Sequence, residues 1–475
     1  SGGLNVQAGT IDTTGGGTLA DTNDVVVSDG ANYIAGTTDT IQSLDNTGTS
    51  TVNAAFITQG SITNNNTGTV NLNVTSTAQD AFTNNEGGIV NQAGDLNVTN
   101  ALTNDGRINV TASKSANVGT FEGAGTGIVD IAGGETLTLK QSGDSTYAGI
   151  LQNSGALNKT GTGALTLTGD STQSGGLNVQ AGTIDTTGGG TLADTNDVVV
   201  SDGANYIAGT ADTIQSLDNT GTSTVNEAFT TQGSITNNNT GTVNLNATTT
   251  AQNFTNNSGG TVNQAEDLNV TNALTNDGTL NVTDSKSANV GTFEGAGTGI
   301  VDIAGGETLT LKQSGDSTYA GILQNSGALN KTGTGALTLT GDSTQSGGLN
   351  VQAGTIDTTG GGTLADTNDV VVSDGANYIA GTTDTIQSLD NTGTSTVNAA
   401  FITQGSITNN NTGTVNLNVT STAQDAFTNN EGGIVNQAGD LNVTNALTND
   451  GRINVTASKS ANVGTFEGAG TGIVD

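Results

Sequence analysis

The side chains in this sequence that could do chemistry are mainly carboxylates, because 43 residues are Asp or Glu while His and Cys are absent. A glycosidase needs two carboxylates on either side of the bond that it cleaves. Asp21 with Asp24, or Glu122 with Asp130, could supply such a pair if neighbouring segments of the chain meet. Pairs among so many acids are more often part of a solvated surface, and we therefore expect no enzyme activity.

Calcium binding is the other chemistry that acids at chain corners suggest, because Asp and Asn oxygens are hard ligands. The repeated Gly-Gly-x-Gly-x-Asp nonapeptide that builds a calcium-binding roll is missing from this sequence. Residues 13–17 and 28–30 are only faint echoes of it. We expect no catalytic, cofactor-binding or dedicated metal site, and weak Ca²⁺ binding stays as an alternative.

The charge balance argues against two classes of partner. Nine Lys and Arg stand against 43 Asp and Glu, which gives a net charge of −34. Phosphate groups are neutralised by clustered cations, so we expect no nucleic-acid partner and no binding to an anionic membrane. No apolar run approaches the roughly 18 residues of a membrane span. We expect membrane contact only through segments outside this sequence.

The chain is built from long tandem copies. The stretch that begins at Ser1 returns at Ser174 and at Ser346, which defines units 1–173 and 174–345 and a partial unit 346–475. Residues 346–475 match residues 1–130 letter for letter, whereas the middle copy carries scattered substitutions and lacks one residue. Tandem copying multiplies length and surface, so it favours a structural or multivalent role. Because Met is absent and the units continue to both ends, we expect a segment of a longer protein.

A shorter phrase recurs about every 20 residues and is clearest in residues 101–110, where an apolar residue, Thr-Asn, a Gly corner and an apolar–polar alternation follow each other. This period predicts one coil of a β-solenoid, in which coils stack as parallel strands. Each residue of the phrase then lies on the equivalent residue of the next coil. The phrase predicts one buried apolar stack of Leu44, Ile62, Phe82, Leu102, Phe121 and Leu151. It also predicts a ladder of hydrogen-bonded amides from Asn46, Asn64, Asn84, Asn104 and Asn153, with solvent-facing turn residues as the alternative.

Two stretches of each unit have a different pattern. Residues 136–149 are followed by a second version in residues 159–183, with Lys-Thr-Gly-Thr-Gly-Ala-Leu-Thr-Leu-Thr-Gly and a closing Ala-Gly-Thr, which recurs from Lys331. This pattern resembles the autotransporter-associated β-strand repeat, and the Thr-Asn-x-Gly coils resemble those of filamentous-haemagglutinin-like adhesins. Gln173 stands where the repeat usually has Tyr. The resemblance implies an autotransporter passenger that forms a right-handed parallel β-helix and is exported across a bacterial outer membrane.

The sequence therefore predicts an all-β fold, a right-handed parallel β-helix of roughly 20 residues per coil arranged in tandem units of about 173 residues. The expected function is a rigid extracellular or cell-surface fibre, or an adhesin stalk, that serves cell adhesion or a biofilm matrix. The alternative is a multivalent carbohydrate- or calcium-binding module with one weak site per unit. Expected partners are further copies of the repeat, identical fibres at the side, and host or matrix glycans.

Overall fold

The computed structural model describes residues 2–19, 21, 23–209, 212–365, 367–381, 384–456 and 458–475. These residues form two compact units, Ser1–Gly233 and Ser234–Asp475. Within the described ranges every regular element is a β-strand and none is a helix. The paired strands run parallel, and the registers join residues about 20 apart. The expected all-β parallel solenoid is confirmed in each unit.

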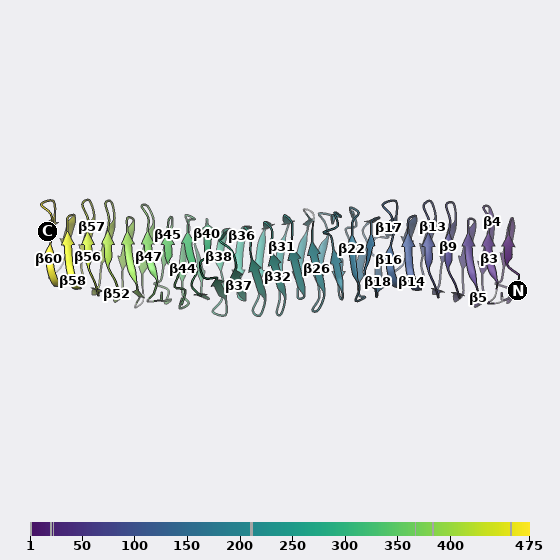
Figure 1. Ribbon diagram of the computed structural model, residues 1–475, viewed down its shortest axis with the longest axis horizontal. Helices are drawn as coiled ribbons and strands as arrows, with labels where there is room; N and C mark the ends of the chain where they lie inside the picture. The colour runs from purple at the N-terminus through teal and green to yellow at the C-terminus, as the bar shows by residue number, and fades with distance from the viewer. Residues whose placement is uncertain are drawn as a thin grey trace. The chain divides into compact units, whose positions relative to one another are not determined.

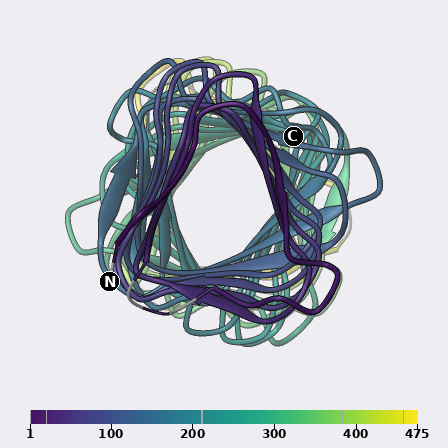
Figure 2. The same cartoon turned by 90° about the vertical axis from the view of Figure 1, so that its right-hand side faces the viewer.

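The regular coils of the N-terminal unit have three strand segments, which we call the first, second and third arm. One coil consists of β8 (Phe56–Thr58), β9 (Ile62–Asn64) and β10 (Thr69–Leu72). The next coil places β11 (Ser76–Ala78), β12 (Phe82–Asn84) and β13 (Ile89–Gln92) upon them in register. Figure 2 shows the three-sided path of the purple coils, and Figure 1 shows their strands side by side.

The strands of the N-terminal unit fall into three ladders, one for each arm. The first arm holds β5 (Asp39–Ile41), β8, β11, the first halves of β14 (Leu96–Asn104) and β16 (Lys114–Glu122), β18 (Thr136–Gln141), β21 (Ala156–Lys159), β23 (Leu177–Val179), β25 (Asp197–Val200) and β28 (Ser216–Asn219). The second arm holds β1 (Leu4–Val6), β3 (Asp24–Val27), β6 (Ser43–Asn46), β9, β12, the second halves of β14 and β16, β19 (Ser145–Tyr147), β22 (Ala164–Leu167), β24 (Thr183–Asp185), β26 (Asn205–Ala208) and β29 (Thr222–Val225). The third arm holds β2 (Gly9–Asp12), β4 (Ala31–Ala35), β7 (Thr49–Val52), β10, β13, β15 (Arg107–Val110), β17 (Ile128–Ile131) and β20 (Ile150–Gln152). A further strand pair of this unit joins β27 (Thr213–Ile214) to β30 (Phe229–Thr231).

The C-terminal unit repeats these elements with few changes of bounds. Its strands are β31 (Ser234–Asn237), β32 (Thr242–Leu245), β33 (Thr249–Ala251), β34 (Asn253–Asn256), β35 (Thr261–Gln264), β36 (Leu268–Asn276), β37 (Thr279–Val282), β38 (Lys286–Glu294), β39 (Ile300–Ile303), β40 (Thr308–Gln313), β41 (Ser317–Tyr319), β42 (Ile322–Gln324), β43 (Ala328–Lys331), β44 (Ala336–Leu339), β45 (Leu349–Val351), β46 (Thr355–Asp357), β47 (Asp369–Val372), β48 (Asn377–Ala380), β49 (Thr385–Ile386), β50 (Ser388–Asn391), β51 (Thr394–Val397), β52 (Phe401–Thr403), β53 (Ile407–Asn409), β54 (Thr414–Leu417), β55 (Ser421–Ala423), β56 (Phe427–Asn429), β57 (Ile434–Gln437), β58 (Leu441–Asn449), β59 (Arg452–Val455), β60 (Ala461–Glu467) and β61 (Ile473–Val474).

Alternation of side chains along each strand produces a thin core. In β12, Phe82 and Asn84 are fully buried whereas Thr83 between them is partly exposed. The same inside–outside pattern holds in β10 and β15, because successive side chains of a strand point to opposite faces. One or two inward positions per strand, filled mainly by Val, Ile, Leu, Phe, Ala and Tyr, therefore supply the hydrophobic interior, and a low apolar content is enough for this fold.

The tandem copy does not return to the arm on which it began. β1 lies on the second arm, but β23, its equivalent in the next copy, pairs with β21 and lies on the first arm. Likewise β4 lies on the third arm, whereas its equivalent β26 lies on the second. The first tandem unit therefore holds eight complete coils and two of the three arms of a ninth coil. Because the ninth coil is one arm short, equivalent residues of the two copies lie on neighbouring arms. Because β21 and β23 pair across residue 173, the first tandem boundary is not a break in the solenoid.

Candidate functional site

The most extended polar arrangement in the N-terminal unit is an amide ladder in its core. Asn46 donates from Nδ2 to Asn64 Oδ1 (2.7 Å), Asn64 to Asn84 (2.8 Å) and Asn84 to Asn104 (2.8 Å). Ser50 Oγ donates to Asn46 Oδ1 at one end of this chain of hydrogen bonds. All four Asn side chains are fully buried, so each carbonyl and amino group depends on its neighbour for a partner.

Each rung of the ladder also holds the corner of its coil. Asn64 Nδ2 donates to the carbonyl oxygens of Gly68 and Ile89, both at 3.1 Å. A Cβ built on Gly68 would lie 2.4 Å from Asn64 Oδ1, which is too close for any other residue. The Thr-Asn-x-Gly phrase thus pairs a buried amide with a residue that leaves room for it.

The ladder ends on a residue that the spacing argument missed. Asn104 Nδ2 donates to the hydroxyl oxygen of Tyr147 at 3.1 Å, and the Tyr147 ring stacks on Phe121 with centroids 4.5 Å apart. A parallel bridge between Gly123 and Tyr147 fixes this position. The Tyr-x-Gly signal in residues 147–149 was visible in the sequence, but its place in the stack was not.

The predicted positions of Asn153 in the amide ladder and of Leu151 in the second-arm stack are wrong, although Leu151 is buried as predicted. Leu151 is buried, but it pairs with Val129 on the third arm, away from Phe121. Asn153 occupies a turn with φ 78°, and its Nδ2 donates to Asp130 Oδ1 at 2.8 Å outside the core. The step of 30 residues from Phe121 to Leu151 spans one coil and one further arm, so the phrase returns on another arm.

The other five members of the predicted stack are register neighbours on the second arm. Ile62 lies between Leu44 and Phe82. Leu102 lies between Phe82 and Phe121, and all five are buried. The C-terminal unit has the same arrangement, in which Asn237, Asn256 and Asn276 are linked at 2.9 and 2.8 Å and Asn276 donates to Tyr319.

A second ladder runs on the outside of the coils. Asn109 donates to Asn91 and Asn91 to Asn71, both at 2.8 Å, and these side chains are partly exposed. The sequence pattern did not separate this outer ladder from the inner one, because both contain Asn at the coil period. Burial distinguishes them, since water can replace a lost partner only on the outside.

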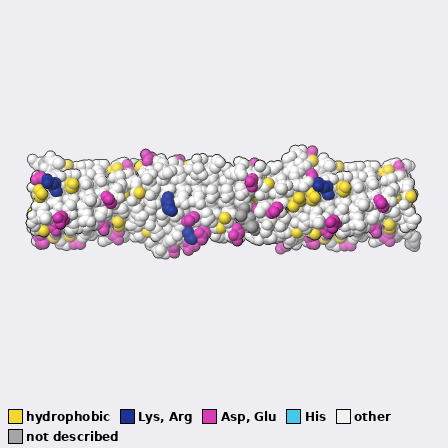
Figure 3. All heavy atoms as spheres, turned by 90° about the horizontal axis from the view of Figure 1, so that it is seen from above, with side chains coloured by type: hydrophobic (Ala, Val, Ile, Leu, Met, Phe, Trp, Pro, Cys, Tyr) yellow, Lys and Arg dark blue, Asp and Glu magenta, His cyan; other side chains and the backbone are white. Residues whose placement is uncertain are grey.

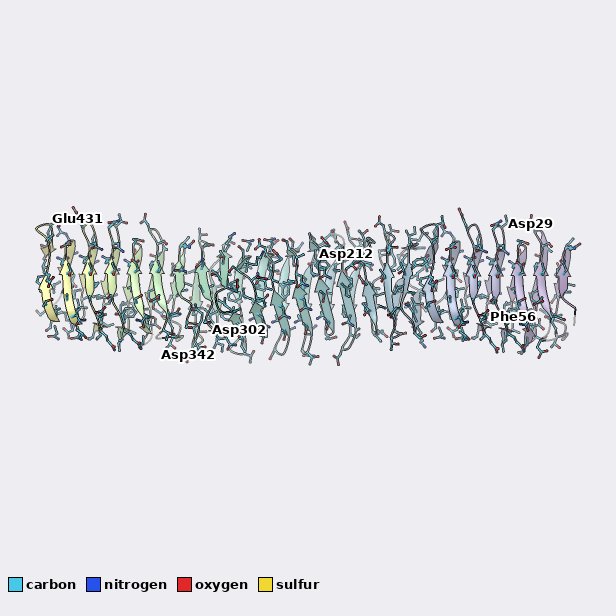
Figure 4. All side chains as sticks on the ribbon, in the orientation of Figure 1. Asp29, Phe56, Asp212, Asp302, Asp342 and Glu431 are labelled. Atoms are coloured by element: carbon cyan, nitrogen blue, oxygen red, sulfur yellow. The ribbon has the colours of Figure 1, made fainter. Side chains whose placement is uncertain are left out.

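Among the described residues, each tandem copy buries one carboxylate, which forms no ion pair. Asp212 (Figure 4) accepts hydrogen bonds from Tyr206 Oη (2.9 Å), Thr186 Oγ1 (2.6 Å) and the Leu192 N–H (3.0 Å). Burial raises the pKa of Asp212, and the hydrogen bonds from Thr186 and its other donors oppose that rise. Asp39 and Asp384 have equivalent partners. The carboxylate fastens the long loop before β25 to the interior, which is a structural role.

A lysine is buried in the segment of residues 159–183, whose sequence resembles the autotransporter-associated repeat. Lys159 is fully buried, and its Nζ donates to the carbonyl oxygens of Gly161 and Ala181. Burial lowers the pKa of Lys159 to about 8, while the charge of Asp144 acts in the opposite direction. Lys331 in the next copy is also fully buried, donates to Gly333, and has a pKa lowered to about 8.

The acid pair Glu122 and Asp130, considered for glycoside cleavage, is not assembled. Glu122 lies on the second arm opposite Thr103, whereas Asp130 lies on the third arm and pairs with Arg107 at 2.8 Å. No group of three or more His, Cys, Asp or Glu side chains suited to a metal ion occurs among the described residues. In those residues there is also no helix of the length and apolarity that a membrane crossing requires.

Comparison with known families agrees with this geometry. A parallel β-solenoid is the class of protein that the fold defines. Residues 157–185 and 329–357 each match the passenger-associated-transport-repeat family. The first match covers most of β21 and all of β22, β23 and β24, and it contains Lys159. The chain thus carries two repeats of the kind found in autotransporter passengers, as its resemblance predicted. No curated protein matches the chain.

The inner ladder should contribute more stability than the outer one. Asn256→Ala leaves Asn276 Oδ1 buried without its donor and should cost about 1–3 kcal/mol of local opening free energy. Asn263→Ala in the same coil removes a partly exposed amide that is hydrogen-bonded to Asn244 and Asn281, and should cost less than half as much. Hydrogen exchange of peptides spanning residues 249–264, which are unique to the middle copy, measures both. Equal losses of local opening free energy in the two variants would contradict the expected difference between the inner and the outer ladder.

The buried lysines predict a stability that rises with alkaline pH. Their pKa is about 8 in the folded chain and about 10.4 when unfolded, so between these values the unfolded state binds more protons. The free energy of unfolding, measured by urea titration, should increase from pH 8 to 10 by at most about 1.4 kcal/mol per pH unit and lysine. The Lys159→Met, Lys331→Met variant should lose most of this slope. An unchanged slope would show that other groups cause it.

Proposed function

We propose that the chain is a structural stalk of a bacterial surface or secreted protein. The observation that carries this proposal is the unbroken series of parallel strand pairs in each unit, in which each added coil extends the same hydrogen-bonded ladder. Stacked coils share one narrow core, and stability grows with nearest-neighbour interfaces along the axis. Such an arrangement converts sequence repetition into length.

The surface suits an extracellular fibre. Figure 3 shows acidic groups and single hydrophobic side chains scattered over one face and few basic groups, with the backbone and all other side chains between them. Net charge of one sign keeps exposed sheets soluble and limits sideways pairing. The passenger-associated-transport repeats and the solenoid together fit a secreted, adhesin-like stalk that lies outside the cell or is anchored to its outer membrane. Cell adhesion and a biofilm matrix are the roles that we propose for it.

The second candidate is a multivalent binding module for glycans or calcium. Near-identical tandem copies support it, because any surface site would be multiplied. The two proposals differ in their readout, since a stalk acts through its length and a module through saturable sites. Calorimetry of the full chain with Ca²⁺, and a glycan array, would favour the module if binding is stoichiometric per tandem copy.

Deleting residues 174–345 tests the stalk directly, because the new junction of Gln173 with Ser346 repeats the natural junction of Gln345 with Ser346. The variant should stay folded and should be shorter by about 40 Å, at about 4.8 Å per coil. Negative-stain electron microscopy of both chains measures this change. Loss of β-structure, or an unchanged particle length, would contradict the proposal.

A further inference from the structure

A shallow surface groove lies on the third arm of the N-terminal unit, beside the corners that precede β13 and β15. Its volume is about 480 Å³. Its lining includes Glu86, Gly88, Ile89, Asp105, Arg107 and Ile128. None of these side chains belongs to the core stack or to the inner amide ladder.

The floor of the groove is aliphatic. Ile89, Arg107 and Ile128 are register neighbours on three successive coils and face outward. Arg107 Nη1 pairs with Asp130 Oδ2 at 2.8 Å, so its charge is already matched. Hydrogen bonds from Asn153, Gln152 and Arg107 hold the pKa of Asp130 below its ordinary value, although burial acts against them. The stem of Arg107 therefore extends the apolar strip between the two isoleucines.

The rim of the groove is acidic. Asp105 Oδ1 accepts a hydrogen bond from the Ala124 N–H at 2.6 Å, and no described residue forms an ion pair with Asp105. Within the described part of the chain, Glu86 has neither a hydrogen-bond partner nor an ion-pair partner. Two negative charges thus stand above an aliphatic floor on a chain of net charge −34. Such a field attracts cations and repels anions.

The fold does not require the side chains of the groove. In the middle copy Ser258, Thr261 and Thr279 replace Glu86, Ile89 and Arg107. The strands β35 and β37 nevertheless keep equivalent bounds and register. The third copy restores the acidic, aliphatic and basic residues, and a groove of about 310 Å³ recurs there at Glu431, Ile434 and Arg452. The three substitutions of the middle copy thus change one surface site without changing the coil.

We propose that this groove binds a short peptide segment that alternates basic and aliphatic side chains. The aliphatic side chains of the peptide pack on Ile89, the Arg107 stem and Ile128. Its ammonium or guanidinium groups pair with Glu86 and Asp105 at the rim. Gly87, Gly88 and Gly106 form part of the lining of the groove. The chain then carries two such sites, in its first and third copies.

The experiment uses the full chain and a fluorescein-labelled peptide of alternating Lys and Leu, followed by fluorescence anisotropy. The first variant gives both grooves the sequence of the middle copy, with Glu86→Ser, Ile89→Thr, Arg107→Thr, Glu431→Ser, Ile434→Thr and Arg452→Thr. Its net charge stays at the value of the parent chain because one acid and one base leave each groove. The parent should bind two peptides per chain, and the variant should bind at least about tenfold more weakly.

The reciprocal variant installs a groove where the sequence lacks one. Ser258→Glu, Thr261→Ile and Thr279→Arg should raise the stoichiometry from two peptides to three, again at constant net charge. A control peptide of alternating Lys and Ser should bind more weakly, because it has no side chain for the aliphatic floor. Equal binding by parent and first variant would overturn the proposal, as general attraction to the acidic surface would explain it. Binding of maltoheptaose with no binding of the peptide would also overturn it, in favour of a glycan site.

Discussion

Parallel backbone pairing between coils is the constraint on which the rest of this structure depends. Because each strand pairs in register with the strand about 20 residues away, every side chain lies on the equivalent side chain of the next coil. An apolar position becomes a buried file, and an Asn position becomes a chain of amides. The corner must then be a residue without a side chain where the amide needs space, as at Gly68. The short phrase in the sequence is the consequence of this stacking.

The sequence was sufficient for the fold class and for the part of the unit with a regular period. Leu44 to Phe121 recur at 18 to 20 residues, and spacing of that kind directly specifies one position in a coil. It was not sufficient for Leu151 and Asn153, because a step of 30 residues does not say on which arm the chain resumes. Tyr147 decides that point by stacking on Phe121 and accepting from Asn104. These are tertiary contacts, and a periodic pattern does not contain them.

For the candidate site, too, the sequence predicted some features and not others. An Asn at the coil period is expected in both the inner and the outer ladder, and only the strand's alternation tells which is buried. The buried Lys159 and Asp212 could not be distinguished in the sequence from exposed charges, because both stand among Gly, Thr and Asn. The groove at Glu86 and Arg107 became visible only when register brought residues of three coils together. Comparison of the tandem copies was the one signal for it.

The rotation by one arm between the first two copies bears on the proposed role as a stalk. Equivalent residues of the first two copies face different sides of the N-terminal unit, so that identical surfaces are distributed around the axis and do not form one flat row. A flat row of identical sheet edges or faces invites association with other chains. A stalk that must stay separate, or present sites on several sides, gains from this rotation.

Disulfide formation between paired cysteines measures the stacking of coils most directly, because the natural chain has no cysteine. Thr63 and Thr83 are register partners on the second arm, and parallel neighbours lie within the Cα separation of roughly 4.4–6.8 Å that a disulfide spans. Mild oxidation of a Thr63→Cys, Thr83→Cys variant should give an intramolecular disulfide in nearly every chain. The Thr63→Cys, Asn71→Cys variant, with residues on different arms, should give none. The opposite result would contradict the stacked coil.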